Sequence, residues 1–226
     1  MTDILKADHP ECISAAVSTL KRGFLIVYPT DTVYGLGAIA TNFRAVQRLF
    51  LAKKRNPKQP LPILLADTCE MERVVSKLPS LALPLAESFW PGALTIVLPV
   101  SPDFQSPALA GKDSVAIRVP NQPILRRIIR SVGEPITGTS ANLSGMATPL
   151  TVESALERVS EHVEIAIDNG PSKTAIASTI IDITRDAPVL LREGPIDRCQ
   201  LERVTRAPIV TAAGAEQGKG IKKEGQ

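Results

Sequence analysis

The sequence has few of the residues that mark disulfide-bonded, zinc-binding and membrane-spanning proteins. Its three cysteines, Cys12, Cys69 and Cys199, are far apart and form no Cys-x-x-Cys pair, which disfavours a disulfide framework or a zinc site. No stretch approaches the roughly 20 consecutive apolar residues that cross a bilayer. The N-terminus, MTDILKADHP, has no basic region followed by an apolar run. We therefore expect a cytoplasmic protein with no signal peptide and no membrane contact.

Several familiar catalytic motifs are also absent. There is no G-x-x-x-x-G-K-[ST], and GPSKT at 170–174 has the wrong spacing, which excludes a Walker-type ATPase. There is no G-x-G-x-x-G, no H-E-x-x-H and no His/Cys/Asp cluster with metal-ligand spacing, so we expect no metal held by the protein. The two histidines, His9 and His162, are expected in an N-terminal tail and on a helix surface. A Ser-His-Asp hydrolase therefore lacks its general base.

The composition is that of an ordinary folded protein, with 44% hydrophobic and 22% charged residues and a formal net charge of +3. This charge is too small to imply a nucleic-acid partner, and aromatic residues, at 4%, are scarce for base stacking. The basic residues gather at 53–58, at 126–130 and near the C-terminus. Their distribution is therefore more informative than their total.

Short runs rich in Val, Ile and Leu predict buried strands separated by helices. The predicted strands are 24–28, 62–66, 94–100, 115–119, 165–167, 179–183 and 189–191. Apolar residues at helical spacing predict helices around 13–20, 46–50 and 124–132, and Thr151 is suited to cap a helix through Val159. Because these elements interleave without a linker, we expect one α/β (α+β) domain, residues 1–207, with a twisted mixed sheet flanked by helices. The polar, charged residues of 208–226 predict a disordered tail.

Two loops are rich in glycine and hydroxyl side chains. Residues 29–37, PTDTVYGLG, follow the first strand, where such residues can contact a substrate; an ordinary strand-to-helix loop is about equally compatible. Residues 137–145, TGTSANLSG, resemble a nucleophile elbow, but Asn142 occupies the position of its second glycine. Ser140 and Asn142 would instead supply donors to a ligand, and the glycines would let the backbone approach phosphate.

Lys53 and Arg55 end the helix that begins near residue 42. Such a pair most often complements the helix dipole on a solvated face, and the residues alone favour that interpretation. The segment that follows, NPKQPLP at 56–62, breaks the helix and leads into a strand. Cations at this corner could also face a cleft.

Arg118 and Arg192 lie opposite the apolar faces of their predicted strands, and Ser178 precedes a third strand. Arginines amid apolar runs need partners, because an unpaired buried guanidinium is costly. Salt bridges to Asp182 or Glu193 would satisfy them as well as an anionic ligand would.

Seven segments resemble, in order, the YrdC-type family of threonylcarbamoyl-AMP synthases. They are YPTDTVYGLG at 28–37, Lys53-x-Arg55 with Pro60-Leu61, FWPGALTIVL at 89–98, VAIRVPNQP at 115–123, TSANLSG at 139–145, STIID at 178–182 and LLREG at 190–194. One such motif would be weak, whereas seven in family order over about residues 11–205 are highly specific. The resemblance implies a YrdC-like domain with a basic concave cleft.

The resemblance also implies a nucleotidyltransferase that converts L-threonine, bicarbonate or CO2, and ATP into threonylcarbamoyl-AMP and pyrophosphate. Threonine's own amine would attack CO2 and the resulting carbamate would attack the α-phosphate, so catalysis would rest on positioning and electrostatic stabilisation. Mg2+ would be carried on the ATP phosphates with several waters. The implied partners are proteins that transfer the threonylcarbamoyl group to the adenosine beside the anticodon of ANN-decoding tRNAs, and a weakly bound tRNA.

By family similarity, the catalytic set is Lys53, Arg55, Ser140 and Asn142. ATP would contact Lys53, Arg55, Asn142 and Arg192. Threonine would contact Thr32, Arg118, Ser140 and Ser178.

Three departures from the family pattern leave this set intact. Leu64 stands where many members have histidine, and Asn56 and Glu193 stand where proline is frequent. The chain also ends soon after the synthase domain, whereas longer members carry a second C-terminal domain.

Two other functions are compatible with parts of this pattern. The same basic cleft would suit a module that binds double-stranded RNA or tRNA, although the modest charge and few aromatics argue against base stacking. A carbamoyl-transfer enzyme related to hydrogenase maturation is the second. It normally belongs to a longer chain with zinc-finger-like and acylphosphatase regions, which this sequence lacks.

Overall fold

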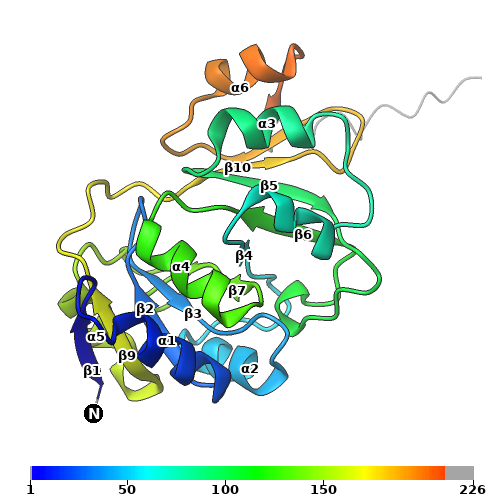
Figure 1. The fold of residues 1–226 in the computed structure, drawn as a ribbon. Coiled ribbons are helices and arrows are strands. Elements are labelled where there is room, and N and C mark those ends of the chain that lie inside the picture. Colours follow the sequence, from blue (N-terminus) through cyan, green and yellow to red (C-terminus); the bar gives the residue numbers. More distant parts are fainter. Residues whose placement is uncertain (1, 212–226) are drawn as a thin grey trace, which may run out of the picture.

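The computed structural model describes residues 2–211 (Figure 1). The α-helices are α1 (Cys12–Lys21), α2 (Phe43–Ala52), α3 (Ala82–Phe89), α4 (Pro123–Val132), α5 (Val152–Val159) and α6 (Arg198–Thr205). The strands are β1 (Asp3–Lys6), β2 (Leu25–Tyr28), β3 (Gly35–Gly37), β4 (Ile63–Leu64), β5 (Leu94–Pro99), β6 (Ser114–Arg118), β7 (Ile136–Thr137), β8 (Thr139–Ser140), β9 (Val163–Asp168), β10 (Thr179–Asp182), β11 (Val189–Arg192) and β12 (Val210–Thr211). Short 3-10 helices are η1 (Thr68–Arg73), η2 (Pro107–Leu109) and η3 (Ser160–His162). Within these residues, no helix is long and apolar enough to span a membrane.

The strands divide between two mixed sheets. The smaller sheet has the order β1-β9-β2-β3-β8, and the larger has the order β12-β11-β10-β5-β6-β4-β7. In the smaller sheet β2 lies parallel to β9 and antiparallel to β3. In the larger sheet β10 lies parallel to β5 and antiparallel to β11. The predicted mixed α/β class is therefore confirmed, although the strands form two sheets where the sequence pattern indicated one.

The chain passes from one sheet to the other over a very short segment. Thr137 ends β7 at an edge of the larger sheet, and Thr139 begins β8 at an edge of the smaller sheet. Gly138 stands between them, and a Cβ atom added there would lie 2.7 Å from Leu64 Cδ2. Any larger residue would therefore displace the Leu64 side chain. This requirement explains one glycine of the 137–145 segment without invoking a ligand.

Local signals mark the ends of α2, α4 and α5. Asn42 caps α2 by accepting a hydrogen bond from the Ala45 amide. Pro123 occupies the first turn of α4, and the helix ends at Gly133 with φ of 79°. At the start of α5, the Thr151 hydroxyl accepts a hydrogen bond from the Ser154 amide, as predicted.

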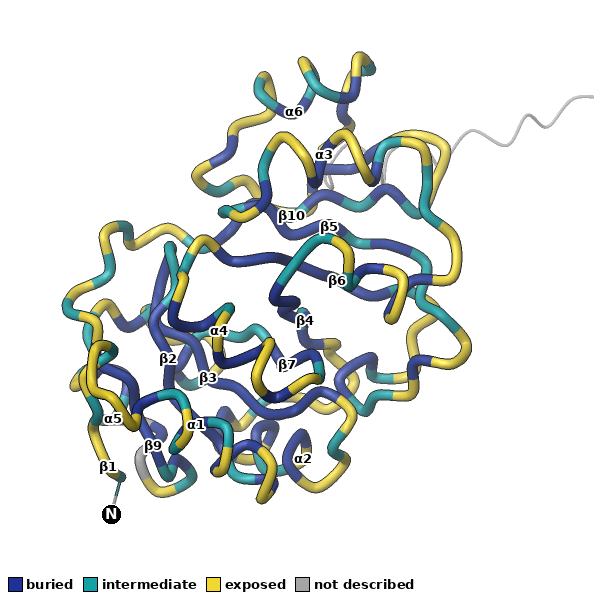
Figure 2. The backbone as a smooth tube through the Cα atoms, in the orientation of Figure 1, coloured by how far each residue is buried: buried dark blue, intermediate teal, exposed yellow. Residues whose placement is uncertain are grey.

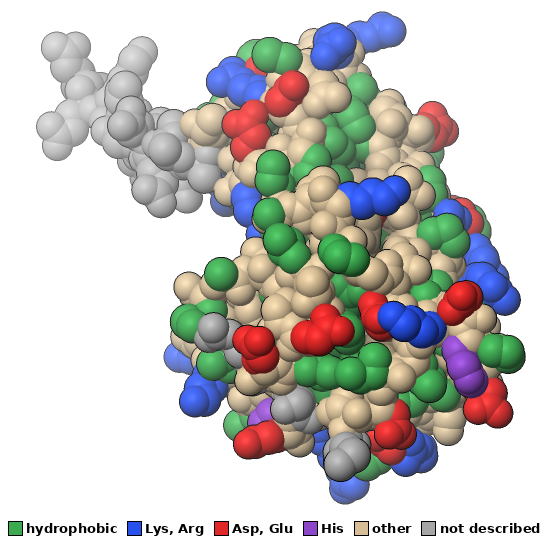
Figure 3. Space-filling view, turned by 90° about the vertical axis from the view of Figure 1, so that its left-hand side faces the viewer, with side chains coloured by type: hydrophobic (Ala, Val, Ile, Leu, Met, Phe, Trp, Pro, Cys, Tyr) green, Lys and Arg blue, Asp and Glu red, His purple; other side chains and the backbone are tan. Residues whose placement is uncertain are grey.

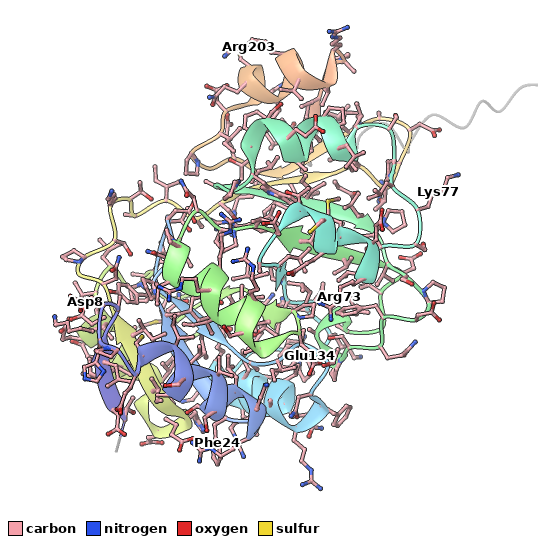
Figure 4. All side chains as sticks on the ribbon, in the orientation of Figure 1. Asp8, Phe24, Arg73, Lys77, Glu134 and Arg203 are labelled. Carbon is pink, nitrogen blue, oxygen red and sulfur yellow. The ribbon has the colours of Figure 1, made fainter. Side chains whose placement is uncertain are left out.

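The helices pack on both sheets and bury their strands. α3 packs on β5 and against α6 at one end of the molecule, whereas α1 packs on β2, β9 and α4 toward the other (Figure 1). α5 contacts β2 and β9 as well. Figure 2 shows that the central strands are buried along most of their length. On the surface, Arg73 donates a hydrogen bond to the Gly133 carbonyl, which ties η1 to the end of α4 (Figure 4).

The fold extends beyond the predicted elements at both ends. Residues 3–6 form β1, which pairs in parallel with β9, so His9 lies in the connection to α1 and the predicted N-terminal tail is wrong. At the other end Ile209 is buried and β12 pairs with β11, so the folded region continues past residue 207 to residue 211. The rest of the predicted tail, 212–226, lies outside the described residues.

Candidate active-site cleft

A cleft of about 460 Å³ is lined by residues from both sheets. The smaller sheet contributes β2, β3 and β8, and the larger sheet contributes β4, β5, β6, β10 and β11. The predicted site residues that line the cleft are Thr32, Arg55, Arg118, Ser140, Ser178 and Arg192. The other two, Lys53 and Asn142, are buried and contact Ser140. The structure therefore gathers all eight predicted residues around one cavity.

One face of the larger sheet forms the floor of this cleft, because strand side chains alternate between the two faces. Thr95 and Val97 of β5 line the cleft, whereas Leu94, Ile96 and Leu98 belong to the hydrophobic core. The neighbouring strands supply Ser114, Ala116, Arg118, Ile180 and Asp182 to the same floor. Polar side chains of adjacent strands therefore project into one shared space.

Three hydrogen bonds fix the guanidinium of Arg118 at the end of β6. Nη2 donates to Asp31 Oδ1 at 2.6 Å, Nη1 donates to Thr32 Oγ1 at 3.1 Å, and Nε donates to the Gly92 carbonyl at 2.8 Å. Burial lowers the pKa of Arg118, which is only 6% exposed, and the Asp31 carboxylate opposes that shift. A guanidinium has five N–H groups, so these bonds leave donors for a ligand.

Ser178, just before β10, bonds to side chains of β5 and β11. Its Oγ lies 2.9 Å from Thr95 Oγ1 and accepts a hydrogen bond from Arg192 Nη2 at 3.2 Å. Arg192 Nε also donates to the Ser178 carbonyl at 2.9 Å. Burial, and then the charge of Arg118, lower the pKa of Arg192. The two guanidiniums therefore repel each other, and an anion bound between them would relieve that repulsion.

The sequence left open whether these arginines pair with Asp182 or Glu193. The carboxylate that pairs with Arg118 is instead Asp31. Among the described side chains, Arg192 forms no ion pair. The salt-bridge alternative is therefore wrong for Arg192, and its guanidinium lines the cleft.

Lys53, directly after α2, uses its ammonium group inside the protein. The residue is 2% exposed. Its Nζ donates to the Ser140 carbonyl, to the Asn142 carbonyl at 2.6 Å and to Asn142 Oδ1 at 3.3 Å. An ammonium has three donors, so these contacts occupy all of them. Burial and the nearby Arg55 lower the pKa of Lys53 to about 8. The solvated-face interpretation is therefore wrong for Lys53.

Arg55 lies at the wall of the cleft. It is partly exposed, and its Nη2 donates to the Pro60 carbonyl at 3.0 Å. Burial lowers the pKa of Arg55, and no carboxylate pairs with it in the part of the chain that is described. A guanidinium without a carboxylate partner suits the planar recognition of a phosphate group.

The 140–146 segment folds around Lys53. Ser140 Oγ donates to Asn142 Oδ1 at 2.5 Å, and Asn142 Nδ2 donates to the Met146 carbonyl at 2.5 Å. The amide and the hydroxyl of Ser144 both bond to the Lys53 carbonyl, at 3.1 and 3.2 Å. Ser140 therefore has an amide oxygen as its partner where a nucleophile elbow would have a general base.

The glycines of the first loop make room for a tyrosine ring. A Cβ atom added at Gly35 or Gly37 would lie 2.4 or 2.5 Å from ring carbons of Tyr28, which is fully buried. The Tyr28 hydroxyl donates to the Thr137 carbonyl at 2.7 Å. The Gly-Leu-Gly pattern therefore has a packing function, and Thr30, Thr32 and Val33 of the same loop line the cleft.

The predicted set omitted polar residues that line the cleft, and it omitted Asp31, which pairs with Arg118. The omitted lining residues include Tyr28, Thr30, Thr95, Lys112 and Ser114. Tyr28, Asp31 and Thr95 lie within the seven segments that carry the family resemblance, but no contact was predicted for them. The alternation of β5 could have revealed Thr95, because it lies between Leu94 and Ile96, whose side chains face the core. Asp31 could not be paired with Arg118 in advance, because the two are 87 positions apart.

The face of the molecule shown in Figure 3 has no large patch of one charge. On the face shown in Figure 3, acidic and basic side chains are interspersed. Within residues 2–211, no group of three or more His, Cys, Asp or Glu side chains could hold a metal ion. Inside the cleft, the positive side chains are Arg55, Lys112, Arg118 and Arg192, and the carboxylate of Asp182 also lines it.

Guanidinium and hydroxyl donors converge in one cleft between the two sheets of this α/β protein, an arrangement that suits an anionic small molecule. The sequence model of the Sua5/YciO/YrdC family, whose description is "Telomere recombination", matches residues 18–194. The chain belongs to this family.

The relatives include enzymes named for one reaction. The threonylcarbamoyl-AMP synthase of Bacillus subtilis is 40% identical over 205 residues, which cover 90% of this chain and 59% of that enzyme. A putative threonylcarbamoyl-AMP synthase of Mycobacterium tuberculosis is 37% identical over 217 residues, covering 94% of this chain and 98% of that protein. The crystal structure of Pyrococcus abyssi Sua5 complexed with L-threonine has a TM-score of 0.89 and 35% identity, covering 99% of this chain and 65% of that one. This chain thus spans about three fifths of the longer relatives.

Proposed function

We propose that this protein is an L-threonylcarbamoyladenylate synthase, which makes threonylcarbamoyl-AMP and pyrophosphate from L-threonine, bicarbonate or CO2, and ATP. The observation that carries the proposal is the convergence of Arg118, Arg192 and Ser178 on one part of the cleft, with Arg55 at its wall. Relatives of this name at 37–40% identity support it. So does the likeness to a family member that was crystallised with L-threonine.

The chemistry needs no nucleophile from the protein. The amine of threonine attacks CO2 and loses a proton, which gives a carbamate. A carbamate oxygen then attacks the α-phosphate of ATP, the bond between the α- and β-phosphates breaks, and pyrophosphate leaves. The protein contributes by holding the reactants in line and by stabilising negative charge on the phosphates. A cleft rich in fixed donors, in which Ser140 bonds to an amide oxygen, suits a reaction whose nucleophiles come from the substrates.

The threonine end of the cleft lies at Arg118. Thr32 is held against this guanidinium at 3.1 Å, and Arg118 retains N–H donors for a carboxylate. Ser178 and Ser140, which also line the cleft, complete the set of threonine contacts. We assign the carboxylate to the space between Arg118 and Arg192, where an anion relieves the repulsion between the two guanidiniums.

The phosphate end lies at Arg55 and Ser140, and Arg192 reaches the nucleotide from β11. Lys53 and Asn142 act on the phosphates through the 140–146 segment, because the Lys53 donors are occupied by Ser140 and Asn142. Mg2+ would arrive on the ATP phosphates and shield their charge during transfer. Proteins that transfer the threonylcarbamoyl group to tRNA would receive the product, and the cytoplasm is the compartment that such a function requires.

The test is an assay of the pure protein with ATP, Mg2+, labelled bicarbonate and each amino acid in turn. We expect threonine-dependent transfer of the label into an adenylate, with release of pyrophosphate. Turnover that ignores threonine would contradict the proposed substrate. Strong, salt-dependent retention of tRNA without nucleotide turnover would instead favour the RNA-binding alternative, which no observation in the described residues supports.

A further inference from the structure

The hydroxyl of Thr95 has one hydrogen-bond partner within the described residues, the hydroxyl of Ser178. The two oxygens are 2.9 Å apart, and both residues line the cleft. Thr95 is 2% exposed and Ser178 is 6% exposed. Thr95 belongs to β5, in the middle of the larger sheet, so its position is set by the rigid part of the fold. Ser178 lies just before β10, at the end of a loop.

The direction of hydrogen bonding at this pair follows from Arg192. A guanidinium can only donate, so the Ser178 oxygen accepts from Arg192 Nη2. The two hydroxyls carry two protons and share one hydrogen bond, which leaves one proton without a protein acceptor. A buried hydroxyl proton that finds no acceptor is costly. The pair therefore favours a ligand that brings an acceptor atom into the cleft.

The charged groups near Ser178 indicate what kind of ligand atom would accept this hydrogen bond. Arg192 bonds to Ser178, and Arg118, which lines the same cleft, is close enough to Arg192 for the two charges to interact. A negatively charged oxygen gains both from the free hydroxyl proton and from the two guanidiniums. If Thr95 donates to Ser178, the buried Thr95 proton is satisfied and the Ser178 proton points to the ligand. The opposite direction would strand the proton of the more deeply buried residue.

We propose that Thr95 is a positioning residue for substrate binding. Its hydroxyl donates a hydrogen bond to Ser178, so that the Ser178 hydroxyl donates its own hydrogen bond to the carboxylate of threonine. This inference rests on the proposed function, because that function identifies the anion. Thr95 affects the binding of threonine only through Ser178 and does not touch the reacting atoms.

The test compares Thr95→Val, which removes the hydroxyl but keeps the shape, with Thr95→Ser, which keeps the hydroxyl. Losing a hydrogen bond that supports a charged ligand should raise the KM for L-threonine about fivefold to tenfold in Thr95→Val. The kcat should change by less than about twofold, because the reacting atoms are untouched. Thr95→Ser should restore a KM close to that of the wild type. Thr19→Val, at a buried threonine of α1 outside the cleft, is the matched control.

A structural function of Thr95 would give a different result. Thr95→Val fills the same volume without a polar atom, so we expect the melting temperature to stay at or above the wild-type value. A lower melting temperature together with a lower kcat would overturn the inference, and so would a wild-type KM in Thr95→Val. Thermal unfolding of the unliganded protein gives the melting temperature, and steady-state assays give kcat and KM.

A double-mutant cycle tests whether Thr95 acts through Ser178. In a Ser178→Ala background, Thr95→Val should raise the KM for threonine by less than about twofold further. A full fivefold increase in that background would mean that Thr95 acts independently, which contradicts the proposal. If the wild-type protein shows no threonine-dependent turnover, the proposed function itself fails. If the wild type shows threonine-dependent turnover and Thr95→Val has the same KM for threonine, the inference about Thr95 fails and the proposed function stands.

Discussion

Lys53 and Arg55 are two positions apart at the end of α2, but their charged groups have different surroundings. Lys53 is buried and donates to the backbone and side chain of the 140–142 segment. Arg55 is partly exposed and lines the cleft. The backbone explains the difference, because α2 ends at Ala52 and Lys54 has a φ of 48°, so the chain turns sharply between the two cations. The two cations of one Lys-x-Arg motif therefore lie in two different environments.

This difference suggests how the cleft is built. The Lys53 ammonium replaces the water that buried carbonyl groups of the 140–142 segment would otherwise need, and it holds Ser140 at the wall. Arg55 is then free to meet a ligand, because Lys53 already satisfies that segment. Lys53 thus stabilises a segment at the wall of the cleft, whereas Arg55 is the cation that we propose contacts the ligand. Variants at the two positions should therefore fail in different ways.

The largest effect on activity is expected for Arg55→Ala. Removing a guanidinium that stabilises phosphate charge should lower kcat/KM for ATP by about 100-fold or more. The free energy of unfolding should change by less than about 0.5 kcal/mol, because the side chain is partly exposed and has no carboxylate partner. Turnover assays and urea unfolding of the same preparation measure both quantities.

Arg44→Ala is the matched control, because Arg44 is exposed on the same helix, α2. We expect wild-type kcat/KM and stability for this variant. Wild-type activity in Arg55→Ala would remove Arg55 from the site. A large loss of stability in Arg55→Ala would show that Arg55, like Lys53, stabilises the fold, which would contradict the proposed difference between them.

Lys53→Met should impair both activity and stability. The substitution leaves the carbonyls of Ser140 and Asn142 without their buried donor, which should cost about 2 kcal/mol of unfolding free energy. Displacement of Ser140 should lower kcat/KM by roughly tenfold or more. Lys54→Met, at the exposed residue between the two cations, should leave both quantities unchanged. A Lys53→Met protein of wild-type stability would show that the segment does not depend on this ammonium.

The smallest effect is a dependence of stability on pH. The pKa of Lys53 is lowered to about 8 in the folded protein, whereas a lysine in an unfolded chain keeps its proton to about pH 10.4. Between these values the unfolded state binds more protons, so the Lys53 contribution to stability rises with pH. The unfolding free energy of the wild type minus that of Lys53→Met should rise by about 1–2 kcal/mol between pH 7.5 and 9.5. A difference that falls with pH would contradict the lowered pKa.

Much of the scaffold could be predicted because its signals are local. The prediction placed a strand at 94–100 and a helix with Pro123 in its first turn, and β5 and α4 occupy those positions. The Thr151 cap was also predictable, because it needs only a hydroxyl three residues before an available amide. α3 and α6 were missed. α3 has no side-chain cap and is fixed by its packing on β5 and α6, which leaves no local signal. α6 does begin with a local signal, the capping box of Asp197 and Gln200, which the prediction overlooked.

The division into two sheets could not be predicted, because it depends on which distant strands pair. β7 and β8 are two residues long, shorter than any periodicity can reveal, and Gly138 between them is required by Leu64 from another strand.

The residues that line the cleft were predicted better than the contacts among them. Family resemblance brought Thr32, Arg118 and Ser178 together, and the structure places them around one cleft. It did not indicate that Lys53 would use all its donors inside the protein, or that Asp31 would be the partner of Arg118. Residue type and spacing determine which groups can bind an anion, but only the packing determines which of them are already occupied.

The most direct test of this account is a crystal structure of the protein with L-threonine and a non-hydrolysable ATP analogue. We predict the threonine carboxylate within hydrogen-bond distance of Arg118 and Ser178, and a phosphate oxygen on the Arg55 guanidinium. The Lys53 ammonium should keep its contacts with Ser140 and Asn142. A Lys53 ammonium that leaves these groups to bind a phosphate, with Arg55 turned away from the ligand, would contradict the central claim.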